Sequence, residues 1–364
     1  MQDQAQPVGD EDTAEPGIVE ITDSGVSIVT DAERRERRIR RVVGVVVATM
    51  ILFLNFEQIA LVTGPNRSVL VQATVTGILI GGVYGLVSMG LTLIYGVLHI
   101  INFAQGALMT VGMYTAFSLV SNFGLDPYAT VIFTVGFLFI IGAAVQGLLI
   151  NRIMKETLEK QLLLTLGLSV FLENVLLLIF SPTPKAVQLP YARGAASIFG
   201  VNIEWPFQVF GAVASLPRTI AFVGAMVLAG MLFLLLQRTS LGVRIRSVAD
   251  NPRGAALVGI DVQRTYILVF GLGAACVGAA GALVLPFLSL EPTTGDAFNV
   301  IAFVVVVLGG MGNVLGALLG GLIIGLTQQI GGIIFTGQSN LLGVFVVFVL
   351  VLFLRPQGLL GRPH

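Results

Sequence analysis

Residues 69–97 read VLVQATVTGILIGGVYGLVSMGLTLIYGV, and none of these side chains is charged. A helix needs about 20 apolar residues to cross the roughly 30 Å hydrocarbon core of a bilayer. This run is therefore long enough to span a membrane. The uncharged character continues well beyond it, since the only charged residue between positions 68 and 151 is Asp126.

The composition extends this conclusion to the rest of the chain. Of its residues, 55% are hydrophobic and 11% are charged, whereas a soluble domain carries about 25% charged residues. In a second long stretch, 266–354, only Glu291 and Asp296 are charged. A soluble fold would need a charged surface over such lengths, but a surface that faces lipid does not. The sequence therefore predicts an all-α polytopic membrane protein.

Apolar runs predict about nine or ten transmembrane helices, including one short or broken span. Full spans are expected at 42–63, 69–97, 105–121, 128–150, 161–180, 218–236, 265–288, 313–335 and 339–354. A shorter piece at 298–309 is followed by glycines, Gly309-Gly310-Met311-Gly312. We interpret it as a half-span or broken helix that is packed inside protein, where freed backbone groups find partners.

Lysine and arginine set the predicted orientation. If the N-terminus is inside and the short piece counts as a crossing, 16 Lys and Arg fall inside and four fall outside. The inside excess of positive charge is the usual orientation signal of membrane proteins. We therefore expect a multi-pass protein of the cell membrane with both termini cytoplasmic. The net charge of the chain is zero. The positions of the charged residues therefore indicate its orientation, and the overall charge does not.

The N-terminal region differs from the remainder. Residues 1–33 are rich in Asp, Glu, Gln, Pro, Gly and Thr, and an arginine cluster begins at Arg34 and closes the expected tail, 1–40. Such a composition cannot bury enough apolar surface to order itself, so we expect a disordered cytoplasmic tail. Residues 41–63 are expected to form an additional transmembrane helix.

Two connections are too long to be turns. The 181–217 segment, predicted to lie outside, is either a docking surface for an external partner or a packed cap over the helices. The 237–264 segment, predicted to lie inside, is strongly basic.

Glycines recur at a spacing of four. Such pairs occur at Gly81 and Gly85, at Gly312, Gly316 and Gly320, and at Gly321 and Gly325. Small residues at this spacing let helix backbones approach closely. The pattern predicts tight helix packing and names no substrate.

The stretch 91–106, LTLIYGVLHIINFAQG, carries the most specific signal. An apolar helix ends there in polar residues and restarts at Gly106. Asn102 and Gln105 are three residues apart, so they would share a face on a helical turn. Breaks of this kind often line a transport path, and the alternative is a polar turn at the membrane interface.

In the span 161–180, Glu173 and Asn174 are candidates for the path or for a hydrogen bond between helices. The substrate-pathway candidates are Tyr84, Ser88, Tyr95, Asn102, Gln105, Gly106, Glu173 and Asn174, and the candidate helix-break glycines are Gly96, Gly309, Gly310 and Gly312.

The inside segment contains a predicted short helix. Asp250 or Asn251 would cap it, Pro252 would lie in its first turn, and Gly259 would end it. Its surface would show Ala255, Ala256, Leu257 and Val258 beside Arg253. Such a helix could dock into a groove of a partner or lie on the lipid. The candidate coupling residues are Arg244, Asp250, Asn251, Pro252, Arg253, Ala256 and Gly259.

The sequence lacks the residues that several kinds of binding site or active site require. No Gly-Lys dipeptide occurs, so the chain has no phosphate-binding loop and ATP would have to be bound by another subunit. His99 is the only histidine that is not terminal, and no cluster of acids and histidines suits a metal or a hydrolytic site. The lone Cys276 lies in an apolar run and is expected to be a small buried hydrophobe. We expect no enzyme activity, no metal and no cofactor.

Four collinear motifs resemble branched-chain amino acid ABC importer permeases of the LivH type. They are GLTLIYG at 90–96 with INFA at 101–104, Gly106 and GMY at 112–114; Arg244, Ala249, Asn251-Pro252, Ala256 and Gly259-Ile260; GGMGN at 309–313 with Gly316-Ala317; and LRPQGL at 354–359. The resemblance covers about 69–361, which is the expected permease domain. Urea and short-amide permeases share the same motifs. The chain departs from the family in having Gln105 where histidine is frequent and Ala107 where an acid is frequent, which bears on substrate identity.

The resemblance implies a five-part importer. This chain would pair with a LivM-type second permease, bind two ATP-binding subunits inside, and receive substrate outside from a solute-binding protein. The segment around Arg253–Gly259 would transmit closure of the ATPases to the helices. A rival hypothesis from the residues alone is a facilitator or secondary transporter that works without partners.

Overall fold

The computed structural model describes residues 18–22, 25–29, 67–154, 156–187, 194–198, 201–205, 207–209, 212–334, 340–355 and 357–360. Its contacts divide the chain into two units, Met1–Leu54 and Asn55–His364. In the first unit, β1 (Ile18–Thr22) pairs antiparallel with β2 (Gly25–Val29). The arginine cluster at 34–41 and the predicted span at 42–63 lie outside the described residues. The predicted tail, cluster and first span therefore stay predictions.

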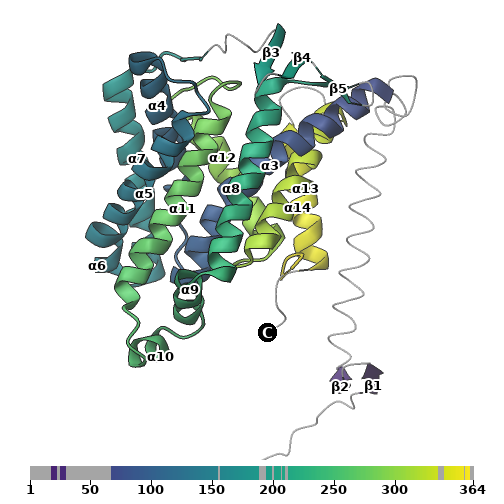
Figure 1. The fold of residues 1–364 in the computed structure, drawn as a ribbon. Coiled ribbons are helices and arrows are strands. Elements are labelled where there is room, and N and C mark those ends of the chain that lie inside the picture. Colours follow the sequence, from purple (N-terminus) through teal and green to yellow (C-terminus); the bar gives the residue numbers. More distant parts are fainter. Residues whose placement is uncertain are drawn as a thin grey trace, which may run out of the picture. The chain divides into compact units, whose positions relative to one another are not determined.

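The second unit is helical, with two small hairpins in one connection (Figure 1). Its helices are α3 (Arg67–Leu98), α4 (Gln105–Phe123), α5 (Thr130–Val145), the π-helix η1 (Gln146–Ile150), α6 (Asn151–Ile153), α7 (Leu158–Phe180), α8 (Leu216–Arg238), α9 (Ser240–Asp250), α10 (Pro252–Leu257), α11 (Val262–Val284), α12 (Thr294–Gly309), α13 (Val314–Ile334) and α14 (Asn340–Leu354). The hairpins are β3 (Gly194–Ile198) with β4 (Val201–Trp205), and β5 (Phe207–Val209) with β6 (Ala212–Ala214).

The prediction of an all-α polytopic membrane protein is confirmed. Among the described residues, six helices are long and apolar enough to cross a membrane, namely α3, α5 with its continuation to Ile153, α7, α8, α11 and α13. The apolar helices α12 and α14 are shorter, so the expected short span at 298–309 is found within α12. The predicted span 105–121 is helical as α4, but its threonines, serines and terminal amides make it less apolar than these six.

The helices divide into central and peripheral ones. In each helix we consider the most apolar stretch of 18 residues. Of these residues, 83% are buried in α3 and 78% in α11, but only 28%, 22% and 28% are buried in α5, α7 and α8. The peripheral helices therefore expose apolar faces, which include Ile132, Phe171 and Leu178. Such faces suit lipid or another membrane subunit, because neither requires polar side chains.

The α3–α13 crossing confirms the packing role predicted for the spaced glycines. A Cβ added at Gly81 would lie 2.9 Å from the backbone oxygen of Gly321, and one at Gly321 would lie 2.3 Å from the backbone nitrogen of Gly85. A Cβ at Gly325 would lie 2.4 Å from the Gly77 oxygen. The two glycine patterns thus pack against each other, and any side chain there would collide with backbone.

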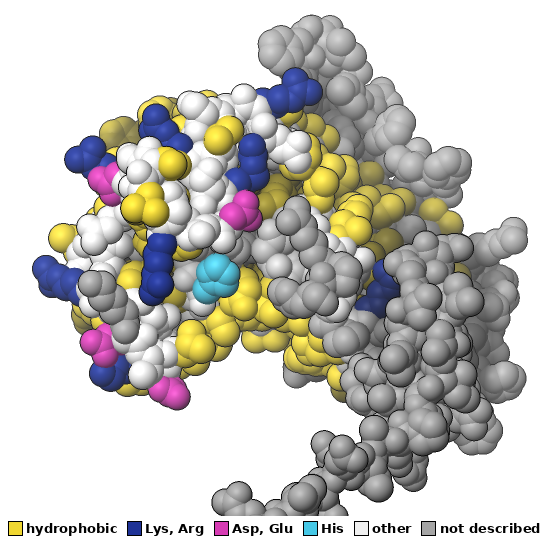
Figure 2. All heavy atoms as spheres, turned by 90° about the horizontal axis from the view of Figure 1, so that it is seen from below, with side chains coloured by type: hydrophobic (Ala, Val, Ile, Leu, Met, Phe, Trp, Pro, Cys, Tyr) yellow, Lys and Arg dark blue, Asp and Glu magenta, His cyan; other side chains and the backbone are white. Residues whose placement is uncertain are grey.

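The bundle of the second unit has two distinct ends (Figure 1). One, the β3–β6 end, holds the hairpins and the start of α8; the other, the α9–α10 end, holds α9, α10 and the end of α8. Figure 2 views the α9–α10 end and shows Lys and Arg side chains scattered over it. Arg238, Arg244, Arg246, Arg253 and Arg264 are exposed in this region.

Candidate functional site

The connection between α3 and α4 returns into the bundle. α3 continues to Leu98, yet the Gln105 side-chain nitrogen donates to the backbone oxygen of Val87 at 3.3 Å. Since a helix rises 1.5 Å per residue, Val87 lies about 17 Å before the end of α3. Residues 99–104 therefore lead back along α3, and α4 begins inside the bundle.

Two amides hold this break together. The Asn102 side-chain nitrogen donates to Gln105 Oε1 at 3.1 Å, and Asn102 Oδ1 accepts from the backbone nitrogen of Ala104 at 3.1 Å. Both side chains are 0% exposed. The two residues were predicted to share a face of a helical turn; they are instead joined by a hydrogen bond, because Asn102 precedes α4 and does not lie on a helical turn. Buried amides need such partners, so these two stabilise the break, and their place in a transport path stays a prediction.

The start of α12 meets the start of α4. A Cβ at Gly106 would lie 2.4 Å from the backbone oxygen of Gly295, and Thr110 Oγ1 accepts from the Gly295 nitrogen at 2.9 Å. The Asn299 side chain donates to the Phe103 backbone oxygen at 3.0 Å. α12 thus begins at the depth of the break and runs for 16 residues, about 24 Å, to Gly309. Two interrupted helices therefore meet inside the bundle.

Glycines close the turn after α12. Gly310 and Gly312 have φ of +100° and +85°, a backbone conformation that favours glycine. A Cβ at Gly309 would lie 2.3 Å from the Gly316 oxygen, and one at Gly96 would lie 3.0 Å from the Gly312 Cα. α12 ends at Gly309, so the interruption expected at 309–312 is found, and it packs against the final turn of α3. Gly96, which was also expected at a helix break, instead lies within α3, and its missing side chain makes room for Gly312.

A cavity of about 520 Å³ lies toward the β3–β6 end, between α3, α8, α12, α13, α14 and the link from α11 to α12. Tyr84 is part of its wall. The Tyr84 hydroxyl donates to Gln328 Oε1 at 2.6 Å, and its ring meets that of Phe298 edge-on at 5.7 Å. Because Tyr84 is three residues from Val87, the cavity reaches the depth of the helix break.

The wall of the cavity combines apolar and polar side chains. Its apolar members are Ile80, Phe287, Leu288, Ala297, Phe298, Ile301 and Leu341. Among the described residues, the charged members of the wall are Arg218, at the start of α8, and Glu291, before α12. Neither residue was among the site residues predicted from the sequence. The feature of the sequence that could have indicated them is that each is an isolated charged residue at the edge of an apolar run.

The other pathway candidates lie apart from the cavity. Ser88 is one turn beyond Tyr84, and its buried hydroxyl has no hydrogen-bond partner among the described residues; the same holds for Thr92. Tyr95 is half-buried near the end of α3, with its ring 6.2 Å from that of His99. Polar side chains three or four residues apart thus continue along α3 from the cavity toward the α9–α10 end, at Tyr84, Ser88, Thr92 and Tyr95.

Glu173 and Asn174 do not line the cavity. Ser169 Oγ donates to Glu173 Oε1 at 2.9 Å, and the Asn174 side chain donates to the Val170 backbone oxygen at 2.7 Å. These bonds lie within α7, while the Glu173 carboxyl also lies beside that of Asp296 in α12. Contact between helices is thus seen at Glu173, whereas Asn174 is exposed.

The predicted coupling segment contains two helices. Thr239 Oγ1 accepts from the Gly242 nitrogen at 3.2 Å and caps α9, and Asn251 Oδ1 accepts from the Gly254 nitrogen at 2.9 Å and caps α10. The capping role of Asn251 and the place of Pro252 at the first turn are confirmed. Gly259 follows α10 with φ of +84°. Asp250, the alternative cap, is instead the last residue of α9, a helix that the sequence analysis did not predict.

One part of the surface prediction is wrong. Ala255 is 4% exposed and packs inward, because the neighbouring helices α9 and α11 cover this side of α10. Leu257 and Val258 are 89% and 77% exposed, and the side chains of Arg253 and Ala256 are also exposed. Ile245 and Val248 of α9 are buried, and the Arg246 guanidinium donates to the Leu236 oxygen. α9 is thus fixed to the bundle, and α10 presents an apolar tip.

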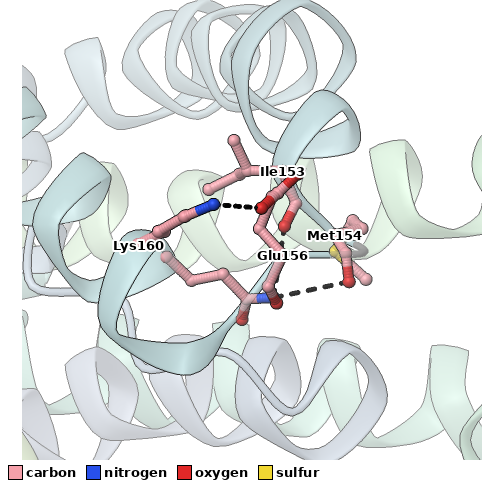
Figure 3. Close-up of polar contacts among 5 residues, drawn as sticks. Ile153, Met154, Glu156 and Lys160 are labelled. Carbon is pink, nitrogen blue, oxygen red and sulfur yellow. Dashed lines mark hydrogen bonds and ion pairs between the residues drawn. The ribbon is translucent and has the colours of Figure 1, made fainter.

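The link from α6 to α7 lies at the same end and is held by polar contacts. Lys160 points toward Glu156 and pairs with it at 2.5 Å (Figure 3). The ammonium of Lys160 lowers the pKa of the Glu156 carboxyl. The Gln161 side chain donates to the backbone oxygens of Ile153 and Glu156 at 3.3 and 3.2 Å.

No group of three or more His, Cys, Asp or Glu side chains in the described part of the chain is placed to hold a metal ion.

The chain is similar to known transport proteins over most of its length. Residues 73–354 match the family described as branched-chain amino acid transport system / permease component. The chain is 31% identical over 302 residues to the high-affinity branched-chain amino acid transport system permease protein BraD of Pseudomonas aeruginosa, which covers 80% of this chain and 96% of BraD. It is 33% identical over 250 residues to the probable branched-chain amino acid transport permease protein LivH of Methanocaldococcus jannaschii, covering 67% and 76%.

A sugar permease is also similar over a shorter region. The ribose import permease protein RbsC of Bacillus subtilis is 30% identical over 181 residues, which covers 46% of this chain and 51% of RbsC. No solved structure matches the chain.

Proposed function

Because the chain belongs to the family of branched-chain amino acid transport system permease components, we propose that it imports amino acids with apolar side chains as one subunit of an ATP-driven complex. In this complex two separate ATP-binding subunits drive transport, a LivM-type second permease completes the path, and a solute-binding protein delivers substrate. The chain itself catalyses no reaction. Both termini lie in the cytoplasm, and the α9–α10 end faces the ATP-binding subunits.

The apolar tip of α10 carries the proposal. Leu257 and Val258 are exposed beyond a helix whose start is fixed by the Asn251 cap and whose end is followed by Gly259. A short capped helix with apolar residues at its tip suits an apolar groove of a partner protein. α9 is buried against the bundle, so a force on α10 would reach the transmembrane helices through packed contacts.

Reconstitution tests the ATP-driven part of the proposal. The complete complex in liposomes, with its binding protein, should take up L-leucine only when ATP is supplied. Liposomes that contain this chain alone should take up none. Leucine flux through the isolated chain would instead support a facilitator, and uptake of urea in preference to leucine would support a short-amide permease.

The Asn251 cap gives a graded prediction. Asn251→Ala removes the acceptor for the Gly254 nitrogen, a change that costs about 0.5–2 kcal/mol at a helix N-terminus. We expect α10 to fray, so that ATP-dependent leucine uptake falls several-fold while the amount of chain in the membrane stays the same. Asn251→Asp is the matched control, because aspartate keeps an oxygen at the same position. Equal uptake by the two variants would refute a role for the ordered helix.

A further inference from the structure

Membership of the family does not say which ligand binds in the cavity at the β3–β6 end. We propose that it binds the zwitterion of an α-amino acid, with Arg218 on the carboxylate, Glu291 on the ammonium group and the apolar wall around the side chain. The proposal rests on the proposed import function and names the site at which this chain receives its substrate.

Two unpaired opposite charges are the first observation. Among the described residues, no ion pair joins Arg218 or Glu291 to any group, including each other. The Arg218 guanidinium lies 5.9 Å from the centre of the Phe287 ring, an interaction that leaves its hydrogen-bond donors available. Both residues are half-buried in a wall that mixes apolar and polar side chains, and a partly buried charge is stabilised by a partner of opposite sign. A ligand that carries one charge of each sign would satisfy both at once.

The Glu291 backbone is fixed in place. Its nitrogen donates to Thr294 Oγ1 at 2.8 Å, at the start of α12. The neighbouring Leu290 pairs with Lys185 through backbone bonds of 2.9 and 2.7 Å. The carboxylate therefore projects from a segment that is tied to α12 on one side and to the connection after α7 on the other.

The size and wall of the cavity suit an apolar amino acid. Its volume, about 520 Å³, lies within the roughly 300–1,000 Å³ of small-molecule sites. Phe287, Leu288, Phe298 and Ile301 offer an apolar surface beside the two charges. A sugar has no charges to neutralise Arg218 and Glu291. In addition, Gln328 Oε1 is already occupied by the Tyr84 hydroxyl, which reduces the acceptors left for sugar hydroxyls.

A labelling experiment on the full chain in liposomes tests this site without transport. In a Cys276→Ala background, Ala297→Cys places a single thiol in the cavity wall, at an exposed position. The rate at which the neutral reagent N-ethylmaleimide modifies this thiol is measured with increasing L-leucine. We expect leucine to slow the reaction. At the same concentrations, 4-methylpentanoate, which lacks the ammonium, and 3-methylbutylamine, which lacks the carboxylate, should have little effect.

Charge-neutralising variants complete the test. Arg218→Gln and Glu291→Gln should each raise the leucine concentration for half-protection at least about tenfold, equivalent to about 1.4 kcal/mol. Arg218→Lys should lose less. The matched controls are Arg238→Gln, at the opposite end of α8, and Glu159→Gln, in the first turn of α7; both should leave protection unchanged. An unchanged labelling rate without leucine shows that the cavity of each variant is intact.

Three results would overturn the assignment: equal protection by the acid or the amine alone, protection by ribose but not by leucine, or no shift in either charge variant. The outcome is separable from that of the proposed function. ATP-driven leucine uptake without protection would reject this site and keep the importer. Protection without uptake by the complete complex would keep the site and reject the importer.

Discussion

Leu257→Asp should abolish ATP-driven uptake while leaving the chain folded in the membrane. Leu257 is 89% exposed, so the folded chain tolerates the charge. An ATP-binding subunit that buries this tip in an apolar groove would have to bury an unpaired carboxylate. Apolar anchors at interfaces contribute about 2 kcal/mol or more, and an unpaired charge adds a further cost. We expect binding of the ATP-binding subunits to weaken at least about 100-fold.

Co-purification and leucine uptake measure this effect. The matched control is Gln263→Asp, which adds the same charge at another exposed position near the same end, in the first turn of α11. That variant should bind the ATP-binding subunits and transport normally. Full uptake by Leu257→Asp would exclude α10 as the coupling contact, whereas loss of both variants from the membrane would point to a folding defect.

The second large effect is expected at the α3–α13 crossing. Gly321→Leu would place a side chain where its Cβ alone lies 2.3 Å from the Gly85 backbone nitrogen. Backbone cannot move aside as the end of a side chain can, so the two helices must separate. Overpacking of a core typically costs 1–3 kcal/mol and occasionally more, and we expect the upper end, about 3 kcal/mol. The variant should yield much less folded protein and unfold at lower temperature.

The control for this prediction uses the same substitution on another helix. At Gly230 of α8, an added Cβ meets nothing within 4 Å. Gly230→Leu should therefore be neutral or slightly stabilising, because leucine has a higher helix propensity than glycine by up to about 1 kcal/mol. Thermal unfolding in detergent compares the two. Equal stability would mean that the α3–α13 contact does not hold the bundle together.

The features that could be predicted from the sequence are local ones. An apolar run predicts a membrane helix wherever it folds, so the described long apolar helices lie where the runs were found. The Asn251 cap and the break at Gly309–Gly312 follow from residues within a few positions of one another. The spacing of Gly81 and Gly85 predicts close packing, since it depends only on helix geometry, but it does not name the partner helix.

The remaining features depend on how distant segments meet. Tyr84 and Gln328 are 244 positions apart and form one hydrogen bond in the cavity wall, and Arg218 and Glu291 come from two further elements. The meeting of Gly106 with Gly295 requires the connection after α3 to return into the bundle. Ala255 was misplaced because the choice of which face of α10 is buried is made by the neighbouring helices.

The sequence by itself determined that this is a membrane protein, where its long apolar helices lie and that Asn251 caps a short helix, because each depends on local composition and spacing. Only the tertiary structure decided that α4 and α12 start against each other inside the bundle and that two isolated charges face one cavity. Those contacts join residues far apart along the chain: glycine spacing predicts that a helix will pack closely, but only the folded bundle shows which helix it meets.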